Sequence, residues 1–248
     1  MKPKTNTLFH FTKDMKVLKL ILENGFWPKY CLEDIEWLDS GDHTHVAFPM
    51  VCFCDIPLSR INDHIEFYGK FGIGLTKDWG QENGINPLAY ILPNKNLAKS
   101  FKELKTYANK LTNGNSDKKL AQNNIRYLYA HTKPLSGRMK VNGLPTRKEF
   151  YQESEWRYVP KDKTIDEYLK EEDFKDKDKL NLANSKTKVN CILKFTPNDI
   201  KYIFVESDLN ISEIIDFIDS KMMGKHPKDQ LNILKSKITS LESVTADI

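Results

Sequence analysis

The spacing of apolar residues near the start of the chain predicts a strand followed by a helix. The run from Leu8 to Phe11 is short and apolar, which is typical of a buried strand. Over residues 13–24 the apolar positions recur every three to four residues, as they do on one face of a helix. Thr12 is the expected N-cap of this helix, and Gly25 stands where a glycine commonly ends one.

A second strand and helix follow in the next stretch of sequence. Residues 46–54 are strongly apolar and β-prone, which predicts a buried strand. Asp55 and Pro57 end this strand and open a helix whose apolar residues again recur every three to four positions. Tyr68 lies at the end of that helix on its buried face, and residues 71–75 predict the next strand.

The second half of the chain is more polar, and its pattern is weaker. Residues 96–132 predict two helices with a break at residues 113–116, whereas residues 134–147 are basic and loop-like. The other expected elements are strands at 88–92, 150–159, 189–195 and 202–205, a short helix opening at Thr196, and helices across 211–240 with a break at 224–227.

Strands and helices are therefore mixed without regular alternation, and we predict an α+β fold. We expect one domain over residues 1–210 and a helical C-terminal appendage over residues 211–248. Within the domain, residues 160–188 are dominated by Lys, Asp and Glu. Such composition favours a charged, exposed insertion.

Composition is that of a globular protein. Of the 248 residues, 40% are hydrophobic and 29% are charged, and the net charge of +4 is too small to indicate nucleic-acid binding by itself. Four cysteines in a chain of this length do not suggest a disulfide scaffold. No apolar run reaches the roughly 20 residues of a membrane span. Since the N-terminus has no signal-peptide core either, we expect a cytoplasmic protein without a membrane partner.

Two aromatic positions could take part in chemistry. His10 lies between aromatic residues at a strand end, where one ring nitrogen can bond the backbone and the other can face a cleft. Tyr68 is followed by a glycine, so its ring could stack on a planar group such as nicotinamide. A structural histidine and a core tyrosine are the commoner explanations of such positions.

A pair of glutamates forms the third candidate. If residues 150–159 are a strand, Glu153 and Glu155 point to the same face. Two carboxylates there suit a site that stabilises a developing positive charge. The alternative is a solvated strand face on which Arg157 pairs with a neighbour.

A metal site is the weakest candidate. Its potential ligands alternate along one strand face, but the more specific Cys-x-x-Cys spacing is missing. Cysteine in an apolar strand usually acts as a small hydrophobic residue, so we predict no metal. The ligands considered are His43, His45, Cys52 and Cys54.

Several long stretches together resemble the AbiGi abortive phage-infection family, whose members are described as phage-resistance or antitoxin components. The core that these stretches span is about two thirds of the chain. They are Leu8 to Lys13, Ile21 to Cys31, Phe48 to Ile61, Tyr68 to Trp79 with the preceding His64, and Glu153 to Arg157.

A more distant resemblance concerns DarT-type ADP-ribosyltransferases. These enzymes place a His on the first strand, a Tyr on a later helix and a Glu on a late strand, and His10, Tyr68 and Glu155 occur here in that order. The resemblance implies a split β-sheet core with flanking helices, NAD as substrate, and transfer of ADP-ribose to an acceptor.

Site residues follow from the same resemblance. Glu155 would bond the ribose 2′-hydroxyl and stabilise the oxocarbenium-like transition state, while Glu153 is the alternative acid or positions the acceptor. His10 would bind ribose hydroxyls, and Tyr68 would stack on nicotinamide. The expected NAD-binding residues are His10, Phe11, Thr12, Ser59, Arg60 and Tyr68.

Two functions therefore compete. The first is an ADP-ribosyltransferase toxin of an antiphage system, acting on RNA or DNA rather than on protein. Such a toxin implies a cognate antitoxin, with a chaperone as a second candidate partner. The second is a catalytically silent antitoxin or phage-sensing binding module, for which residues 160–188 and the C-terminal helices offer contact surfaces.

Overall fold

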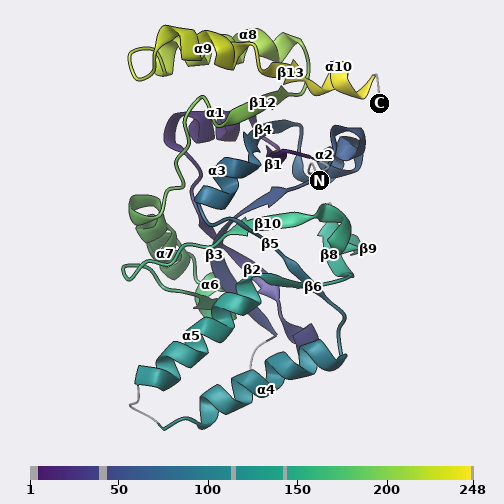
Figure 1. Cartoon of the computed structure of the whole chain (residues 1–248), viewed down its shortest axis with the longest axis vertical. Helices are drawn as coiled ribbons and strands as arrows, with labels where there is room; N and C mark the ends of the chain where they lie inside the picture. Colours follow the sequence, from purple (N-terminus) through teal and green to yellow (C-terminus); the bar gives the residue numbers. More distant parts are fainter. Residues whose placement is uncertain (1–4, 39–43, 113–115, 142–143, 247–248) are drawn as a thin grey trace. The chain divides into compact units, whose positions relative to one another are not determined.

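A computed structural model describes residues 5–38, 44–112, 116–141 and 144–246 (Figure 1). It confirms the α+β class, since helices are mixed with parallel and antiparallel strands. The described chain divides into two compact units, each assembled from separated segments. The first unit holds Met1–Phe26, Cys52–Ile85 and Leu193–Ile248, and the second holds Trp27–Val51 and Asn86–Ile192.

The first unit has a sheet at its centre. Its strands are β1 (Thr7–Thr12), β4 (Phe71–Thr76), β12 (Ile200–Val205), β13 (Ile238–Ser240) and the last residues of β3 (His45–Cys54). The order is β13-β12-β4-β1, and β1 also pairs with β3 through Phe9 and Cys54. The pairs β1–β4 and β4–β12 are antiparallel, whereas β12 and β13 run parallel.

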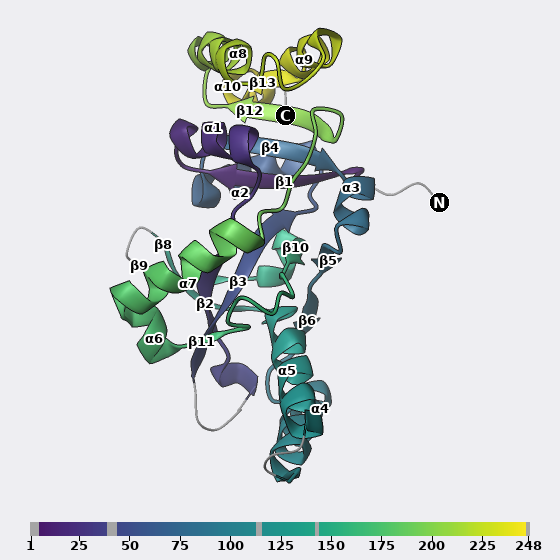
Figure 2. The same cartoon turned by 90° about the vertical axis from the view of Figure 1, so that its left-hand side faces the viewer.

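Helices surround this sheet. They are α1 (Met15–Asn24), η2 (Leu58–Arg60), α2 (Ile61–Tyr68), α3 (Lys77–Glu82), α8 (Leu209–Lys221), α9 (Lys228–Lys235) and α10 (Leu241–Thr245). Both views show α8 and α9 beside the β12–β13 edge (Figure 1 and Figure 2). The core between sheet and helices includes Phe9, Phe11, Ile61 and Phe204.

The helix α1 begins two residues later than the sequence predicts, because its N-cap is Asp14 and not Thr12. Thr12 is still part of β1, and the side chain of Asp14 caps the helix by accepting a hydrogen bond from the backbone N of Lys16 at 2.7 Å. An Asp caps as well as a Thr does, because either side chain satisfies a free N–H of the first turn. Gly25 ends the helix with a φ of 87°, as predicted.

The second unit contains most of the short strands. They are β2 (Lys29–Asp34), β5 (Asn86–Pro87), β6 (Ala89–Ile91), β7 (Thr132–Pro134), β8 (Gly137–Val141), β9 (Leu144–Lys148), β10 (Glu155–Tyr158) and β11 (Leu169–Lys170). β2 and β11 pair antiparallel with β3, and the path continues from β3 to β10 and β5. β6 and β7 form a parallel pair, and β8 and β9 form an antiparallel one.

The helices of the second unit flank these strands. They are η1 (Glu36–Leu38), α4 (Asn96–Lys110), α5 (Ser116–Ala130), η3 (Phe150–Glu153), α6 (Glu171–Lys175) and α7 (Lys177–Asn190). Figure 2 shows α4 and α5 side by side, as the sequence predicts for residues 96–132. None of the helices in the described ranges is long and apolar enough to cross a membrane.

Residues 134–147 are not the loop that their basic composition predicts. They hold the end of β7, all of β8 and most of β9, and Gly137 pairs with Lys148 at the open end of the β8–β9 ladder. Backbone pairing across a hairpin does not require an apolar face, so composition is a poor guide here. The sequence does contain Asn142-Gly143, which is a strong hairpin signal.

Residues 160–195 also differ from the sequence interpretation. The expected charged insertion contains α6 and α7, and Leu169 and Ala183 pack into a buried cluster with Tyr30 and Ala47. The strand predicted at 189–195 is wrong. Helix α7 continues to Asn190, and the later residues make only an isolated bridge, between Leu193 and Phe26.

Candidate functional site

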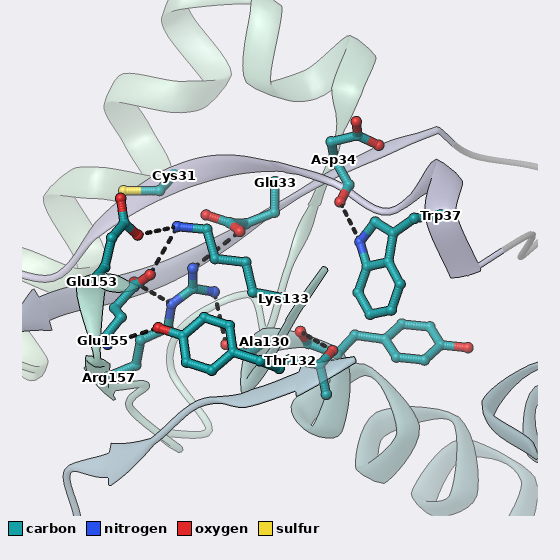
Figure 3. A network of polar contacts seen from close by, with 12 residues as sticks. Cys31, Glu33, Asp34, Trp37, Ala130, Thr132, Lys133, Glu153, Glu155 and Arg157 are labelled. Carbon is teal, nitrogen blue, oxygen red and sulfur yellow. Dashed lines mark hydrogen bonds and ion pairs between the residues drawn. The ribbon is translucent and has the colours of Figure 1, made fainter. Parts of the chain in front are cut away.

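A cluster of buried and half-buried charges joins separate segments of the second unit (Figure 3). Its side chains come from β2, β7, the end of β9, η3 and β10. We name it the charge cluster, and its members are Glu33, Lys133, Lys148, Glu153, Glu155 and Arg157.

Arg157 stands at the centre of this cluster and is only 1% exposed. Its Nε donates to Glu155 Oε1 at 2.7 Å, and its Nη2 donates to Glu33 Oε2 at 3.1 Å. Its Nη1 donates to the backbone carbonyl of Ala130 at 2.9 Å. The planar guanidinium thus ties β10 to β2 and to the end of α5.

Lys133 bridges the two glutamates. Its Nζ lies 2.9 Å from Glu155 Oε2 and 2.9 Å from Glu153 Oε2. The second oxygen of Glu153 lies 2.7 Å from Nζ of Lys148. Both oxygens of both carboxylates are therefore held by cations. Figure 3 shows Lys133 between Glu153 and Glu155, and Arg157 between Glu155 and Glu33.

The cluster is electrically balanced, with three carboxylates facing three cations. Burial alone lowers the pKa of Lys133, but Glu155, Glu153 and Glu33 raise it well above its ordinary value. A carboxylate that is neutralised by two close cations is a weak base and offers little net field to an electron-poor sugar carbon. The geometry of Glu155 thus supports a structural ion network more than an NAD-cleaving acid.

Glu153 and Glu155 do not lie on one strand, which corrects the expectation from alternation. Glu153 ends η3, and Ser154 has a left-handed backbone with a φ of 44° before β10 begins at Glu155. The turn nevertheless brings both carboxylates to Lys133. The solvated strand face that we considered as the alternative is absent too, because Glu153, Glu155 and Arg157 are all buried.

His10 lies in the first unit and is tightly held. Its Nδ1 donates to the backbone carbonyl of Cys52 at 2.8 Å, so Nε2 is the nitrogen without a proton when the ring is neutral. The ring packs edge-on against Phe26, with centroids 5.1 Å apart, and against Phe53. Burial lowers the pKa of His10, although the bond to Cys52 opposes this.

Tyr68 also belongs to the first unit, at the end of α2. Its ring lies 4.6 Å from that of His64, which in turn contacts Phe11. Phe11 is buried in the core, and Tyr68 is half-buried against the same cluster. Thr12 accepts a hydrogen bond from the backbone N of Asp14 at 3.5 Å. The structure thus gathers Phe11 and Tyr68 around His64.

The remaining predicted residues are at the surface or outside the described chain. Ser59 and Arg60 are exposed in η2, at the start of α2. Among the described residues no group of His, Cys, Asp or Glu could hold a metal ion. His43, one of the potential zinc ligands, lies outside them. The six NAD-binding candidates all belong to the first unit, whereas Glu153 and Glu155 belong to the second.

Half of the charge cluster was not predicted from the sequence, namely Glu33, Lys133 and Lys148. The contact of Arg157 with Glu155 was predictable, because Arg157 follows Glu155 by two residues and so shares its strand face. Lys133 and Glu33 reach the cluster only through tertiary folding. No local spacing in the sequence marks them.

An exposed apolar stripe runs along α4 in the second unit. Its first three members follow at intervals of seven and three residues, which places them on one helix face, and the fourth is the C-cap residue that ends the helix. We name it the α4 stripe, and it consists of Leu97, Leu104, Tyr107 and Leu111, which are 56%, 50%, 66% and 39% exposed.

A groove of about 520 Å³ adjoins the stripe. Tyr107 lines it together with Trp37 and Leu38 of η1. The α4–α5 pair is also basic, because its sequence carries seven Lys or Arg residues against one Glu and one Asp. An apolar patch that a fold leaves exposed is a candidate protein-binding surface.

The pKa of His10 leads to a prediction about acid stability. Because its folded pKa is lowered, the unfolded chain binds the proton more readily, and stability is lost as the pH falls below about 6.5. His10→Asn keeps an amide donor for Cys52 but does not titrate. We expect the free energy of unfolding to fall less steeply from pH 7 to 5 in this variant, as measured by urea denaturation. Equal slopes would contradict the assignment.

Comparisons with known proteins give one family. Residues 24–206 match the family model described as "Putative abortive phage resistance protein AbiGi, antitoxin", and this range includes the charge cluster and the α4 stripe. The chain is 33% identical over 249 residues to the abortive phage resistance protein AbiGi of Lactococcus lactis subsp. cremoris, which covers 90% of this chain and 99% of the relative. No solved structure matches. The chain therefore belongs to the AbiGi family of abortive phage resistance proteins.

Proposed function

We propose that this chain is the antitoxin of an abortive infection pair and that it acts by binding a cognate toxin protein. The description of its family names an antitoxin, which supports the binding role over the toxin role. The observation that carries the proposal is the α4 stripe, an apolar helix face that the folded unit leaves exposed. A partner that covers it would remove this apolar area from water.

The chemistry of the stripe indicates what kind of surface the toxin presents. The stripe offers leucines and a tyrosine, and aromatic anchors of this type commonly carry binding energy. The two helices that form this part of the unit, α4 and α5, are rich in Lys and Arg. We therefore expect the toxin to contribute an apolar patch with an acidic rim, which would steer association electrostatically.

The charge cluster also supports this proposal, because it argues against the competing role as an ADP-ribosyltransferase. In an ADP-ribosyltransferase the catalytic Glu must be available to the ribose, but here Arg157 and Lys133 occupy both oxygens of Glu155. ADP-ribose transfer, an ADP-ribosyltransferase-like split sheet, a nucleic-acid acceptor and a chaperone partner stay predictions from the sequence. Their test is release of nicotinamide from labelled NAD in the presence of total cellular RNA, DNA and protein.

A growth experiment tests the proposed function. The protein encoded by the gene next to that of this chain is induced from one promoter, and the wild-type chain is expressed from an unrelated promoter. We expect the neighbouring protein alone to arrest growth and the chain to restore it, whereas the chain alone is harmless. Growth arrest by the chain itself would instead identify it as the toxin, and failure to restore growth would also reject the antitoxin role.

A further inference from the structure

His131 carries a buried ring nitrogen that the fold leaves without a partner. The residue stands between the end of α5 and the start of β7 and is half-buried as a whole. Its Nδ1 lies 2.9 Å from the backbone carbonyl oxygen of Tyr127, so Nδ1 carries the proton and donates. Nε2 is then an acceptor, and it is buried with no hydrogen-bond partner among the residues that the structure describes. Buried polar atoms are nearly always hydrogen-bonded, so Nε2 of His131 is an exception.

The surroundings of His131 disfavour a positive charge on its ring. Burial lowers the pKa of His131, although the hydrogen bond to the Tyr127 carbonyl opposes this. Arg157 of β10 and Lys161 lower the pKa further, because both are cations. Lys161 Nζ lies 3.8 Å from the centre of the Tyr127 ring, and the centre of that ring lies 4.6 Å from the centre of the imidazole. Since burial raises the pKa of the Tyr127 hydroxyl, that group supplies no negative charge.

The backbone around His131 connects several elements of the second unit. Its N–H donates to the carbonyl of Leu128 at 3.0 Å, at the end of α5. Its carbonyl accepts from the N–H of Ala89 at 3.0 Å, where the parallel pair of β6 and β7 begins. The carbonyl of the preceding residue, Ala130, accepts from Arg157 at the centre of the charge cluster. A change at His131 therefore reaches α5, the β6–β7 pair and the charge cluster through direct contacts.

We propose that His131 is a pH-sensitive switch, which keeps the junction of α5, β6 and β7 closed while it is neutral and opens the junction when mild acid protonates it. The neutral ring needs one acceptor, which the Tyr127 carbonyl supplies. The protonated ring needs a second acceptor for Nε2–H, and water supplies it once the junction opens. The switch lies wholly within the second unit and does not depend on the antitoxin role.

Proton linkage fixes the direction and the size of the effect. Because the folded pKa of His131 is lowered, the open junction binds the proton more tightly than the closed one does. Opening therefore becomes easier as the pH falls below about 6.5, the ordinary pKa of an exposed imidazole. One proton changes the opening constant by at most about tenfold per pH unit, so the increase from pH 7.5 to 5.5 is about tenfold.

Hydrogen exchange of the full-length chain, followed by mass spectrometry at pH 7.5 and 5.5, tests this inference. Exchange rates are first corrected for the intrinsic pH dependence of amide exchange. We then expect peptides that cover residues 86–91 and 127–134 to show an opening constant about tenfold higher at pH 5.5. An opening constant of these segments that is the same at both pH values would overturn the inference.

Two substitutions remove the titrating ring in different ways. His131→Asn keeps an amide donor for the Tyr127 carbonyl, whereas His131→Phe keeps an aromatic ring of similar size. In each variant that circular dichroism shows to be folded at pH 7.5, the increase in acid should disappear. Lys161→Gln removes one neighbouring cation and should make the increase smaller, which decides the question even if neither His131 variant folds.

His45→Gln is the matched control. His45 also belongs to the second unit, but 36% of its side chain is exposed. This variant should show the same increase in opening as the wild type. An increase that persists in a folded His131 variant, or that disappears in the control, would assign the acid sensitivity to another group and overturn the inference.

Discussion

Replacing Arg157 with methionine is expected to lower the free energy of unfolding by about 3–5 kcal/mol, because it removes one partner from a buried ion network. The variant leaves Glu155 and Glu33 without the guanidinium that neutralises them. It also removes the donor to the carbonyl of Ala130. Methionine fills a similar volume, so the loss reports the uncompensated charges rather than a cavity.

Urea denaturation followed by tryptophan fluorescence measures this change. Arg147→Met is the matched control, because Arg147 is exposed, and its effect should remain within about 0.5 kcal/mol. Adding Glu155→Gln to Arg157→Met should restore part of the lost stability, since one of the unpaired charges is then gone. If Arg157→Met differs from wild type by less than 1 kcal/mol, roughly the change of an ordinary substitution, the charge cluster is not structural.

A loss of activity in Glu155→Gln has to be interpreted together with the stability of that variant. That substitution removes a charge that pairs with both Arg157 and Lys133. A loss of activity could then follow from unfolding of the second unit alone. Circular dichroism and the urea midpoint of the variant must therefore accompany any assay with NAD.

The double substitution Leu97→Glu and Leu104→Glu is expected to weaken toxin binding at least about 100-fold. Each leucine is half or more exposed, so the fold should tolerate the change within about 0.5 kcal/mol. At the centre of an interface, each lost anchor commonly costs 2 kcal/mol or more. Two new carboxylates would also face the acidic rim that we expect on the toxin.

Titration calorimetry with purified toxin and the growth experiment both measure this effect. Leu209→Glu is the matched control, because Leu209 is 88% exposed on α8, away from the α4 stripe in sequence and in another unit. It should bind the toxin and restore growth as the wild type does. Equal affinity of the α4 variant and the control would move the binding surface elsewhere on the chain.

Elements whose burial pattern is local were predictable from the sequence. The strand β3 was predictable because nearly every side chain of residues 46–54 is apolar, and the helix α1 was predictable because one face of residues 15–24 is apolar. The β8–β9 hairpin was missed because its residues carry no apolar alternation. The strand β13 was also missed, since three residues between helices give too short a pattern to read.

The candidate site was predictable only where the sequence places its residues together. Glu153 and Glu155 stand out as a pair in the sequence. Their role, however, depends on Lys133, which lies twenty residues before Glu153. The sequence does not identify the partners of these two carboxylates, whereas the structure shows cations that neutralise both of them. The order of His10, Tyr68 and Glu155 could not reveal this, because ion pairing is decided by tertiary contacts.

The most direct test of the account is titration of the purified wild-type chain with the purified toxin, in a buffer that contains NAD. We predict saturable binding with a Kd below about 1 µM and no release of nicotinamide. Steady release of nicotinamide by the chain, without measurable binding to the toxin, would contradict the account and favour an NAD-dependent enzyme.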